Sequence, residues 1–218
     1  MVTSERMASY INSLDTGHGE LLDRIARSAR ADLVPVIRNE TASFLKTMVT
    51  VKQPAAILEV GTAVGYSALL MSLAMPPSCH ITTIEKYEPR IPVARENFRL
   101  AGAEDRITLL EGDAEAILPS LSGFFDFIFM DAAKGQYIHW LPLILRLMPA
   151  GGVLVSDNVL QDGDIIESRF AVERRNRTIH SRMREYLYTL KHTAELETSV
   201  IPIGDGVAVS VRKLGVSL

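Results

Sequence analysis

The sequence predicts an α/β protein: a doubly wound, mostly parallel seven-stranded sheet with extra N-terminal helices and an antiparallel hairpin at the C-terminal edge. From residue 55 to about residue 157, short apolar runs alternate with helical patterns, which is typical of βαβ units. Two β-rich runs near the end flank a turn at Gly204-Asp205-Gly206, and such neighbours pair antiparallel. With 218 residues and 47% hydrophobic content, the chain can bury one sizeable core, so we expect a single domain.

The expected elements follow from the spacing of the apolar residues. Residues 1–54 are expected to form a helical cap with helices at 3–14, 18–30 and 38–51, the last two separated at Pro35. Residues 55–218 are expected to form the α/β core, with strands at 57–60, 81–84, 107–110, 127–130, 153–156, 198–203 and 207–211. A long helix near residues 169–191 precedes the hairpin.

Oxygen-bearing side chains follow two of these strands at the point where each strand ends. One apolar run passes into Asp131, and the next passes into Asp157 and Asn158. Carboxylate and amide oxygens suit Mg²⁺, and Lys134 would then stand near the metal as a base. The alternative is that the acids cap the helices that follow, because Asp and Asn are preferred N-cap residues. A single strand end favours the cap, whereas both ends together with Lys134 favour the metal site.

A second group of strand ends indicates a small-molecule cofactor. The first strand enters a turn with Gly61 and Gly65, and this GxxxG spacing differs from the GxGxxG that holds a pyrophosphate. The second strand ends in Glu85, which is able to accept hydrogen bonds from both ribose hydroxyls. The third ends at Gly112-Asp113-Ala114, where an adenine edge can be read. In this order these features predict a nucleoside cofactor without phosphates, which points to S-adenosylmethionine.

Charge and cysteine content restrict the partners. The formal net charge is −3, yet residues 169–184 hold six arginines and one glutamate. Arginine suits phosphate contacts, so a nucleic acid is one interpretation of this stretch and a solvated helix face is the other. Cys79, the single cysteine, fits a reducing compartment. The N-terminal residues lack the apolar run of a signal peptide and no apolar run is long enough for a membrane span, so we expect a cytoplasmic protein.

The sequence resembles metal-dependent class I O-methyltransferases of the catechol and caffeoyl-coenzyme A type over nearly its whole length. The residues that carry the resemblance are Glu59-Val60-Gly61 through Gly65-Tyr66-Ser67, Asp131-Ala132-Ala133-Lys134, Ser156-Asp157-Asn158-Val159 and Gly204-Asp205-Gly206. Within that family, the bacterial tRNA 5-hydroxyuridine methyltransferases are the most similar subgroup. That similarity lies in Val34-Pro35, Val51-Lys52-Gln53-Pro54, Asp131 through Tyr137 and the arginine-rich stretch near residue 174.

The resemblance implies the Rossmann-like methyltransferase fold and a set of site residues. S-adenosylmethionine is expected to contact Ile37, Glu59, Gly61, Thr62, Gly65, Ser67, Glu85, Gly112, Asp113, Ala114 and Asp131. Mg²⁺ or another divalent cation is expected on Asp131, Asp157 and Asn158, with Lys134 as the proton acceptor and Asp131 beside it as a catalytic residue. Substrate or RNA contacts are expected at Arg174, Arg175, Arg177, Tyr137 and Asp205. The resemblance also leads us to expect a homodimer.

Three functions are compatible with this pattern. The preferred one is methylation of 5-hydroxyuridine in tRNA to 5-methoxyuridine, and the second is methylation of a small catechol or caffeoyl-like phenol. Both substrates carry a hydroxyl beside a second oxygen, so the same metal chemistry serves either. The third is a non-catalytic S-adenosylmethionine sensor, against which the intact Asp131, Lys134, Asp157 and Asn158 argue. Tyr137 and Trp140 are expected either to wall a substrate ring or to pack in the core.

Overall fold

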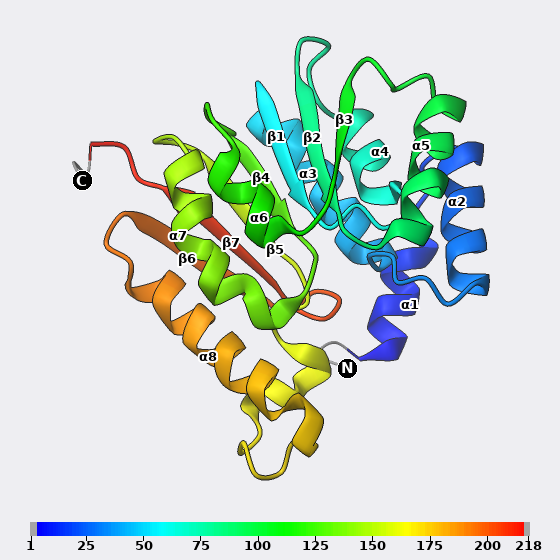
Figure 1. Cartoon of the computed structure of the whole chain (residues 1–218). Helices are drawn as coiled ribbons and strands as arrows, with labels where there is room; N and C mark the ends of the chain where they lie inside the picture. Colours follow the sequence, from blue (N-terminus) through cyan, green and yellow to red (C-terminus); the bar gives the residue numbers. More distant parts are fainter. Residues whose placement is uncertain (1–3, 216–218) are drawn as a thin grey trace.

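A computed structural model describes residues 4–215, and within them one seven-stranded sheet lies between two layers of helices (Figure 1). Its strands are β1 (Ala56–Val60), β2 (His80–Glu85), β3 (Ile107–Glu111), β4 (Phe127–Met130), β5 (Val153–Ser156), β6 (Leu196–Ile201) and β7 (Val207–Arg212). The strand order is β3-β2-β1-β4-β5-β7-β6, with β1 to β5 parallel and β7 antiparallel to both of its neighbours. The predicted fold class is confirmed.

Helices cover both faces of the sheet. The layer that shares a core with Ile57 and Phe127 contains α2 (Glu20–Ala31), α3 (Asn39–Lys52), α4 (Tyr66–Ser72) and α5 (Ile91–Leu100), and α1 (Glu5–Ser13) packs on α3. The opposite layer contains α6 (Ala114–Ile117), α7 (Tyr137–Leu147) and α8 (Arg177–His192). Short 3₁₀ turns are η1 (Glu88–Arg90), η2 (Leu118–Ser120), η3 (Lys134–Gln136), η4 (Gln161–Ile166) and η5 (Arg174–Asn176).

Strand β4 shows why a central strand is apolar at every position of its sequence. Phe127 and Phe129 enter the core on the α3 side, whereas Ile128 and Met130 enter the core on the α7 side. Successive side chains of a strand point to opposite faces, and here both faces are covered by helices. The N-terminal helices contribute to the first of these cores through residues such as Leu45 and Val49, so they share a core with the sheet.

The helix expected over residues 169–191 begins only at Arg177. Residues 167–173 are irregular and project from the body of the molecule, in yellow to orange at the bottom of Figure 1. The Arg177 guanidinium donates to the carbonyls of Phe170 and Val172. These hydrogen bonds hold the segment beside the start of α8, so the segment does not form part of the helix. Arg169, Arg174 and Arg175 therefore do not lie on a common helix face with Arg184, and the expectation of one arginine-lined helix was wrong.

The C-terminal hairpin is confirmed, but its turn is longer than a two-residue Asp-Gly turn. Ile201 pairs with Val207, so five residues connect β6 and β7, and Gly206 within them has a φ of 87°. Strand β7 inserts between β5 and β6, which leaves β6 at the edge. Among residues 4–215, no helix combines the length and the apolar character needed to cross a bilayer.

Candidate active site

The parallel strands bring Asp131 and Asp157 side by side. The amide of Asp131 donates to the carbonyl of Val60 (3.0 Å), and the amide of Asp157 donates to the carbonyl of Met130 (2.9 Å). Each aspartate thus continues the ladder by one residue beyond its strand. Strands β1 and β4 are also the neighbours at which the strand order reverses, and ligands of doubly wound sheets bind outside the strand ends at that point.

Neither aspartate caps a helix, which was the alternative interpretation of these strand ends. Ala133 and Leu160 occupy the N-cap positions of η3 and η4, and Gln136 occupies that of α7, without a side-chain cap hydrogen bond at any of the three. The capping role is instead taken by Asp113, whose side chain accepts the Glu115 amide at the start of α6 (2.9 Å). The carboxylates of Asp131 and Asp157 are therefore free for another purpose.

The electrostatics of this pair favour a cation. Asp157 is 3% exposed, and its Oδ1 has no hydrogen-bond partner among the described residues. Burial, followed by the charge of Asp131, raises the pKa of Asp157 to about 7, and burial also raises the pKa of Asp131. The nearby Lys134 opposes both shifts. Two crowded, desolvated carboxylates are stabilised by a bound cation, so these residues fit a divalent metal.

Asn158 supplies a third oxygen. Its backbone is left-handed (φ 58°), and its Nδ2 donates to Asp205 Oδ2 (3.0 Å), so its Oδ1 is the amide atom available to a cation. Asp131, Asp157 and Asn158 together are called the acidic corner below. No group of three or more His, Cys, Asp or Glu side chains within residues 4–215 is arranged to hold a metal ion, and the Asn158 amide adds an oxygen to the two carboxylates here.

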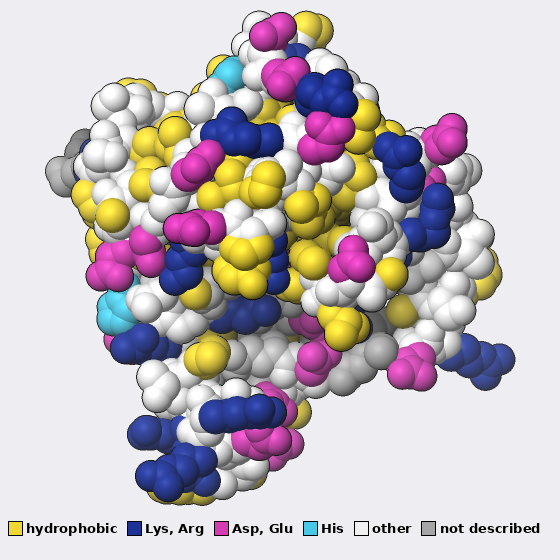
Figure 2. All heavy atoms as spheres, turned by 45° about the vertical axis from the view of Figure 1, so that its right-hand side comes forward, with side chains coloured by type: hydrophobic (Ala, Val, Ile, Leu, Met, Phe, Trp, Pro, Cys, Tyr) yellow, Lys and Arg dark blue, Asp and Glu magenta, His cyan; other side chains and the backbone are white. Residues whose placement is uncertain are grey.

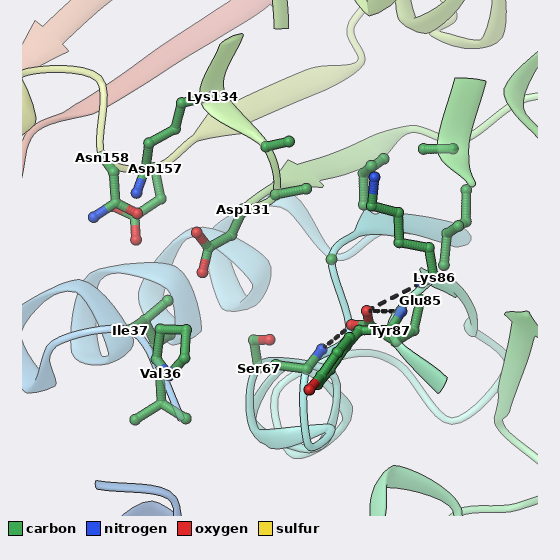
Figure 3. Close-up of a pocket in the computed structure, with 18 of the residues that line it drawn as sticks. Val36, Ile37, Ser67, Glu85, Lys86, Tyr87, Asp131, Lys134, Asp157 and Asn158 are labelled. Carbon is green, nitrogen blue, oxygen red and sulfur yellow. Dashed lines mark hydrogen bonds between the residues drawn. The ribbon is translucent and has the colours of Figure 1, made fainter. Parts of the chain in front are cut away.

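One cavity of about 530 Å³ connects the acidic corner to Glu85 at its other end (Figure 3). That volume is in the range of small-molecule sites. The predicted residues that line it are Ile37, Gly61, Ser67, Glu85, Gly112, Asp113, Ala114, Asp131, Lys134, Asp157, Asn158 and Asp205. In Figure 3 the amino group of Lys134 points toward Asp157 and Asn158. The metal and base residues expected from the sequence, and most of the expected cofactor residues, thus border a single space.

Glu85 is fixed by the backbone. Its Oε2 accepts the Ala63 amide (2.7 Å), and its Oε1 accepts the amides of Lys86 (3.0 Å) and Tyr87 (2.8 Å). A carboxylate offers about four lone-pair sites, so three are used by the protein and one on Oε2 is left for a ligand hydroxyl. Glu85 is therefore a preorganised acceptor.

Three residues expected at the cofactor lie beneath the cavity instead. Glu59 and Thr62 are buried and both meet the Thr83 hydroxyl, which donates to Glu59. Burial raises the pKa of Glu59 to about 7, although the hydroxyls of Ser67 and Thr83 lower it. Gly65 has a φ of 84°, and a Cβ there would lie 2.5 Å from Phe98, so packing demands this glycine.

Gly61 lines the cavity, but the close approach that requires glycine is to the protein. A Cβ on Gly61 would lie 2.1 Å from the carbonyl oxygen of Asp131, where the loops after β1 and β4 touch. A glycine at the end of a strand often allows a ligand to approach the backbone closely. Gly61 instead allows the close contact that positions Asp131.

Tyr137 is in the core and does not face the cavity. It is fully buried, its hydroxyl donates to the Met130 carbonyl (3.0 Å) and accepts the Ala132 amide (3.2 Å). The expectation that it contacts a substrate was wrong, because its hydroxyl ties down the ends of β4 and β5. Trp140 does line the cavity, and among the described residues its buried Nε1 has no hydrogen-bond partner.

Arg38 was missed from the sequence. It lines the cavity, and its guanidinium contacts Asp205 (2.6 Å) and Asp162 (2.9 Å). It thereby joins the segment before α3, the turn after β5 and the hairpin turn. No local sequence signal indicates this contact, because the partners are more than 120 residues away along the chain.

The arginines of residues 169–184 divide into two groups. Arg182 donates to the Gly135 carbonyl (3.0 Å) and Arg184 to the Ile165 carbonyl (3.0 Å), so both, like Arg177, hold the protein's own backbone. Arg174 and Arg175 are exposed, and Arg175 pairs with Glu173 (2.7 Å). Figure 2 shows basic and acidic side chains gathered on the projecting segment.

Comparison with known proteins agrees with this geometry. Residues 16–214 match the O-methyltransferase family. A caffeoyl-CoA O-methyltransferase from Populus kitakamiensis is 32% identical over 185 residues, which are 82% of this chain and 77% of that protein. A catechol O-methyltransferase from Niastella koreensis is 37% identical over 129 residues, which are 57% of this chain and 58% of that protein.

Solved structures share the fold. The crystal structure of an SAH-bound methyltransferase from Podospora anserina has a TM-score of 0.87 and 27% sequence identity. The alignment covers 96% of this chain and 94% of that chain. The similarity therefore extends over the N-terminal helices as well as the sheet.

Proposed function

Because the chain belongs to the O-methyltransferase family and is an S-adenosylmethionine-dependent O-methyltransferase, we propose that it methylates 5-hydroxyuridine in tRNA. The observation that carries the choice of substrate is the projecting segment, residues 167–173, together with the turn η5 that follows it. This region follows the acidic corner along the chain, exposes Arg169, Arg174 and Arg175, and exposes 82% of Phe170. Exposed arginines beside an exposed aromatic ring are typical of surfaces that bind single-stranded RNA.

The proposed reaction is direct transfer. The substrate oxygen attacks the methyl carbon of the sulfonium, the carbon–sulfur bond breaks, and S-adenosylhomocysteine leaves. Positioning of the two reactants supplies about 7–11 kcal/mol of the barrier reduction in reactions of this kind. Glu85 and the backbone near Gly112 orient the nucleoside of the cofactor, while the acidic corner receives the substrate oxygens.

Lys134 is the proposed proton acceptor. Its amino group points into the acidic corner, where the substrate hydroxyl would lie (Figure 3). We propose that Asp131, Asp157 and Asn158 hold Mg²⁺ or another divalent cation. When bound, that cation would stabilise the oxyanion of a substrate that presents a hydroxyl beside a second oxygen. In 5-hydroxyuridine these are the 5-hydroxyl and the O4 carbonyl.

The decisive experiment is mass spectrometry of tRNA nucleosides from a strain that lacks the gene. The tRNA of that strain is measured before and after incubation with the purified protein. We expect 5-methoxyuridine to disappear, 5-hydroxyuridine to accumulate, and the purified protein with S-adenosylmethionine and Mg²⁺ to restore the modification in vitro. Unchanged tRNA nucleosides in the deletion strain would contradict the proposal.

A small catechol or caffeoyl-like phenol is the second candidate, and the names of the similar proteins favour it. The acidic corner accepts the two oxygens of a catechol equally well. Steady-state kinetics on caffeoyl-CoA, a free catechol and 5-hydroxyuridine tRNA separate the candidates by kcat/KM. A cytoplasmic location and a homodimer belong to the same proposal, and sedimentation of the purified protein tests the latter.

A further inference from the structure

A second cavity lies under the projecting segment. It has a volume of about 370 Å³ and is lined by Glu167, Ser168, Arg169, His180, Ser181 and Arg184. None of these residues lines the cavity of the acidic corner. The second cavity therefore sits between residues 167–169 and the first two turns of α8, apart from the reacting groups.

His180 is the residue that makes this cavity unusual. It lies on the core-facing side of α8 with Met183 and Tyr186, and only 2% of its surface is exposed. Both ring nitrogens are buried, and neither has a hydrogen-bond partner within residues 4–215. Leaving a buried polar group unpaired costs about 1–3 kcal/mol, so most such groups in native proteins have partners. A ring N–H here needs an acceptor that the protein does not supply.

The remaining lining residues indicate which ligand would provide that acceptor. Two arginines and the Ser168 hydroxyl offer donors, against the single carboxylate of Glu167, and no hydrophobic side chain lines the cavity. The Ser181 hydroxyl donates to the Arg177 carbonyl. Arg184 already donates one N–H to the Ile165 carbonyl, which fixes its guanidinium at the wall. A planar guanidinium beside hydroxyl and imidazole donors matches an oxyanion with several acceptor oxygens.

We propose that this cavity binds a phosphate group of the methyl-accepting substrate, held by His180, Arg169 and Arg184. The inference rests on the proposed function for the source of the phosphate, an RNA backbone, while a coenzyme A thioester carries the same chemistry. Arg182 of the same helix contacts the Gly135 carbonyl, next to Lys134. The helix that presents His180 thus also contacts η3, the turn that carries Lys134, and we propose that one substrate engages both places.

Binding is tested first without turnover. Protein labelled with ¹⁵N-histidine is titrated with inorganic phosphate, and the His180 ring signals are assigned by loss in His180→Gln. We expect those signals to shift with saturation, while the signals of His192, stacked on Tyr188 at the far end of α8, stay in place. No shift at His180, or the same shift with chloride at matched ionic strength, would overturn the proposal.

Steady-state kinetics then test whether the cavity binds a phosphate of the substrate. His180→Gln and Arg169→Gln should each raise KM for 5-hydroxyuridine tRNA about tenfold, the size expected for one charge-assisted hydrogen bond. The rate on free 5-hydroxyuridine nucleoside, which has no phosphate, should not change. Arg99→Gln, an exposed arginine on α5 paired with Glu96, is the matched control. Thermal melting of each variant shows whether it is folded. If His180→Gln does not fold, Arg169→Gln on the exposed segment decides whether the phosphate site exists.

The outcomes for the cavity and for the proposed function are separable. A wild-type protein that methylates tRNA with unchanged KM in both variants would refute the phosphate site and leave the function standing. A wild-type protein that is inactive on tRNA but active on caffeoyl-CoA, with KM raised tenfold by the variants, would support the phosphate site and refute the tRNA substrate.

Discussion

The carboxylates at the two ends of the large cavity differ in whether the protein itself compensates their negative charge. At one end, Glu85 accepts three backbone amides, so its charge is compensated by the protein. At the other end, Asp131 and Asp157 repel each other in a desolvated corner, and within the described chain Asp157 Oδ1 has no partner. Both ends sit at the same edge of the same sheet. We propose that the difference separates a binding end, built in advance, from a reacting end whose carboxylates a cation and substrate would stabilise.

Asp157→Ala tests the reacting end and should have the largest effect. Loss of the cation's oxyanion stabilisation, several kcal/mol, should lower the rate by about 10³-fold or more. Affinity for S-adenosylmethionine, measured by calorimetry, should stay within a few fold, because Glu85 is untouched. Full activity of the wild-type protein in excess EDTA would contradict the metal site.

Lys134→Ala removes the proposed base and keeps the carboxylates of Asp131, Asp157 and Glu85. The maximal rate should fall by roughly 10²- to 10³-fold, within the usual range for a general base, with little change in cofactor affinity. The pH profile of kcat should lose the limb that the base controls. A variant with a near-normal rate at every pH would show that the hydroxyl ionises without Lys134.

Asp205→Asn loosens the reacting end indirectly. Asp205 accepts the Asn158 amide and contacts Arg38, so the variant should free the Asn158 side chain to turn. We expect affinity for the divalent cation to fall by about 10- to 100-fold, as for other residues that orient metal ligands. Titration of activity with Mg²⁺ measures this, and Glu96→Gln, an exposed acid elsewhere, should leave the titration unchanged.

Glu85→Gln tests the binding end. The amide keeps one acceptor oxygen but loses the charge, so affinity for S-adenosylmethionine should fall by about tenfold. At saturating cofactor the maximal rate should stay close to that of the wild type. An equal loss in both quantities would erase the distinction between the two ends.

Glu59→Gln should leave activity nearly unchanged and alter the pH dependence of stability. The folded-state pKa of Glu59 is raised from 4.5 to about 7, so the folded protein binds this proton more tightly than the unfolded chain. Its stability is fully present below pH 4.5 and falls, by on the order of 3 kcal/mol, as the pH rises to about 7. Denaturant unfolding of Glu59→Gln should lack that fall. The same slope in both proteins would assign it to another group.

Much of this site is encoded locally and was therefore predictable. Asp131 and Asp157 each follow a strand and Glu85 is the last residue of one, and parallel pairing places all three at one edge of the sheet. The details that depend on packing were not predictable. The hydroxyl of Tyr137 donates to the Met130 carbonyl in the core, and Arg38 forms an ion pair with Asp205. Arg177, the first residue of α8, donates to the Phe170 carbonyl. No periodicity or motif encodes these contacts, because each depends on how the surrounding side chains and backbone pack in three dimensions.

The insertion of β7 between β5 and β6 determines when the sheet is completed while the chain is synthesised on the ribosome. One edge of β5, the strand that carries Asp157, has no partner until residues 207–212 have emerged. Asp205, which orients Asn158, arrives at the same moment. A nascent chain thus exposes a free edge of β5, a hazard for aggregation, until residues 207–212 have been made and have paired with it. Methyl transfer and the pairing of β7 with β5 should therefore appear together.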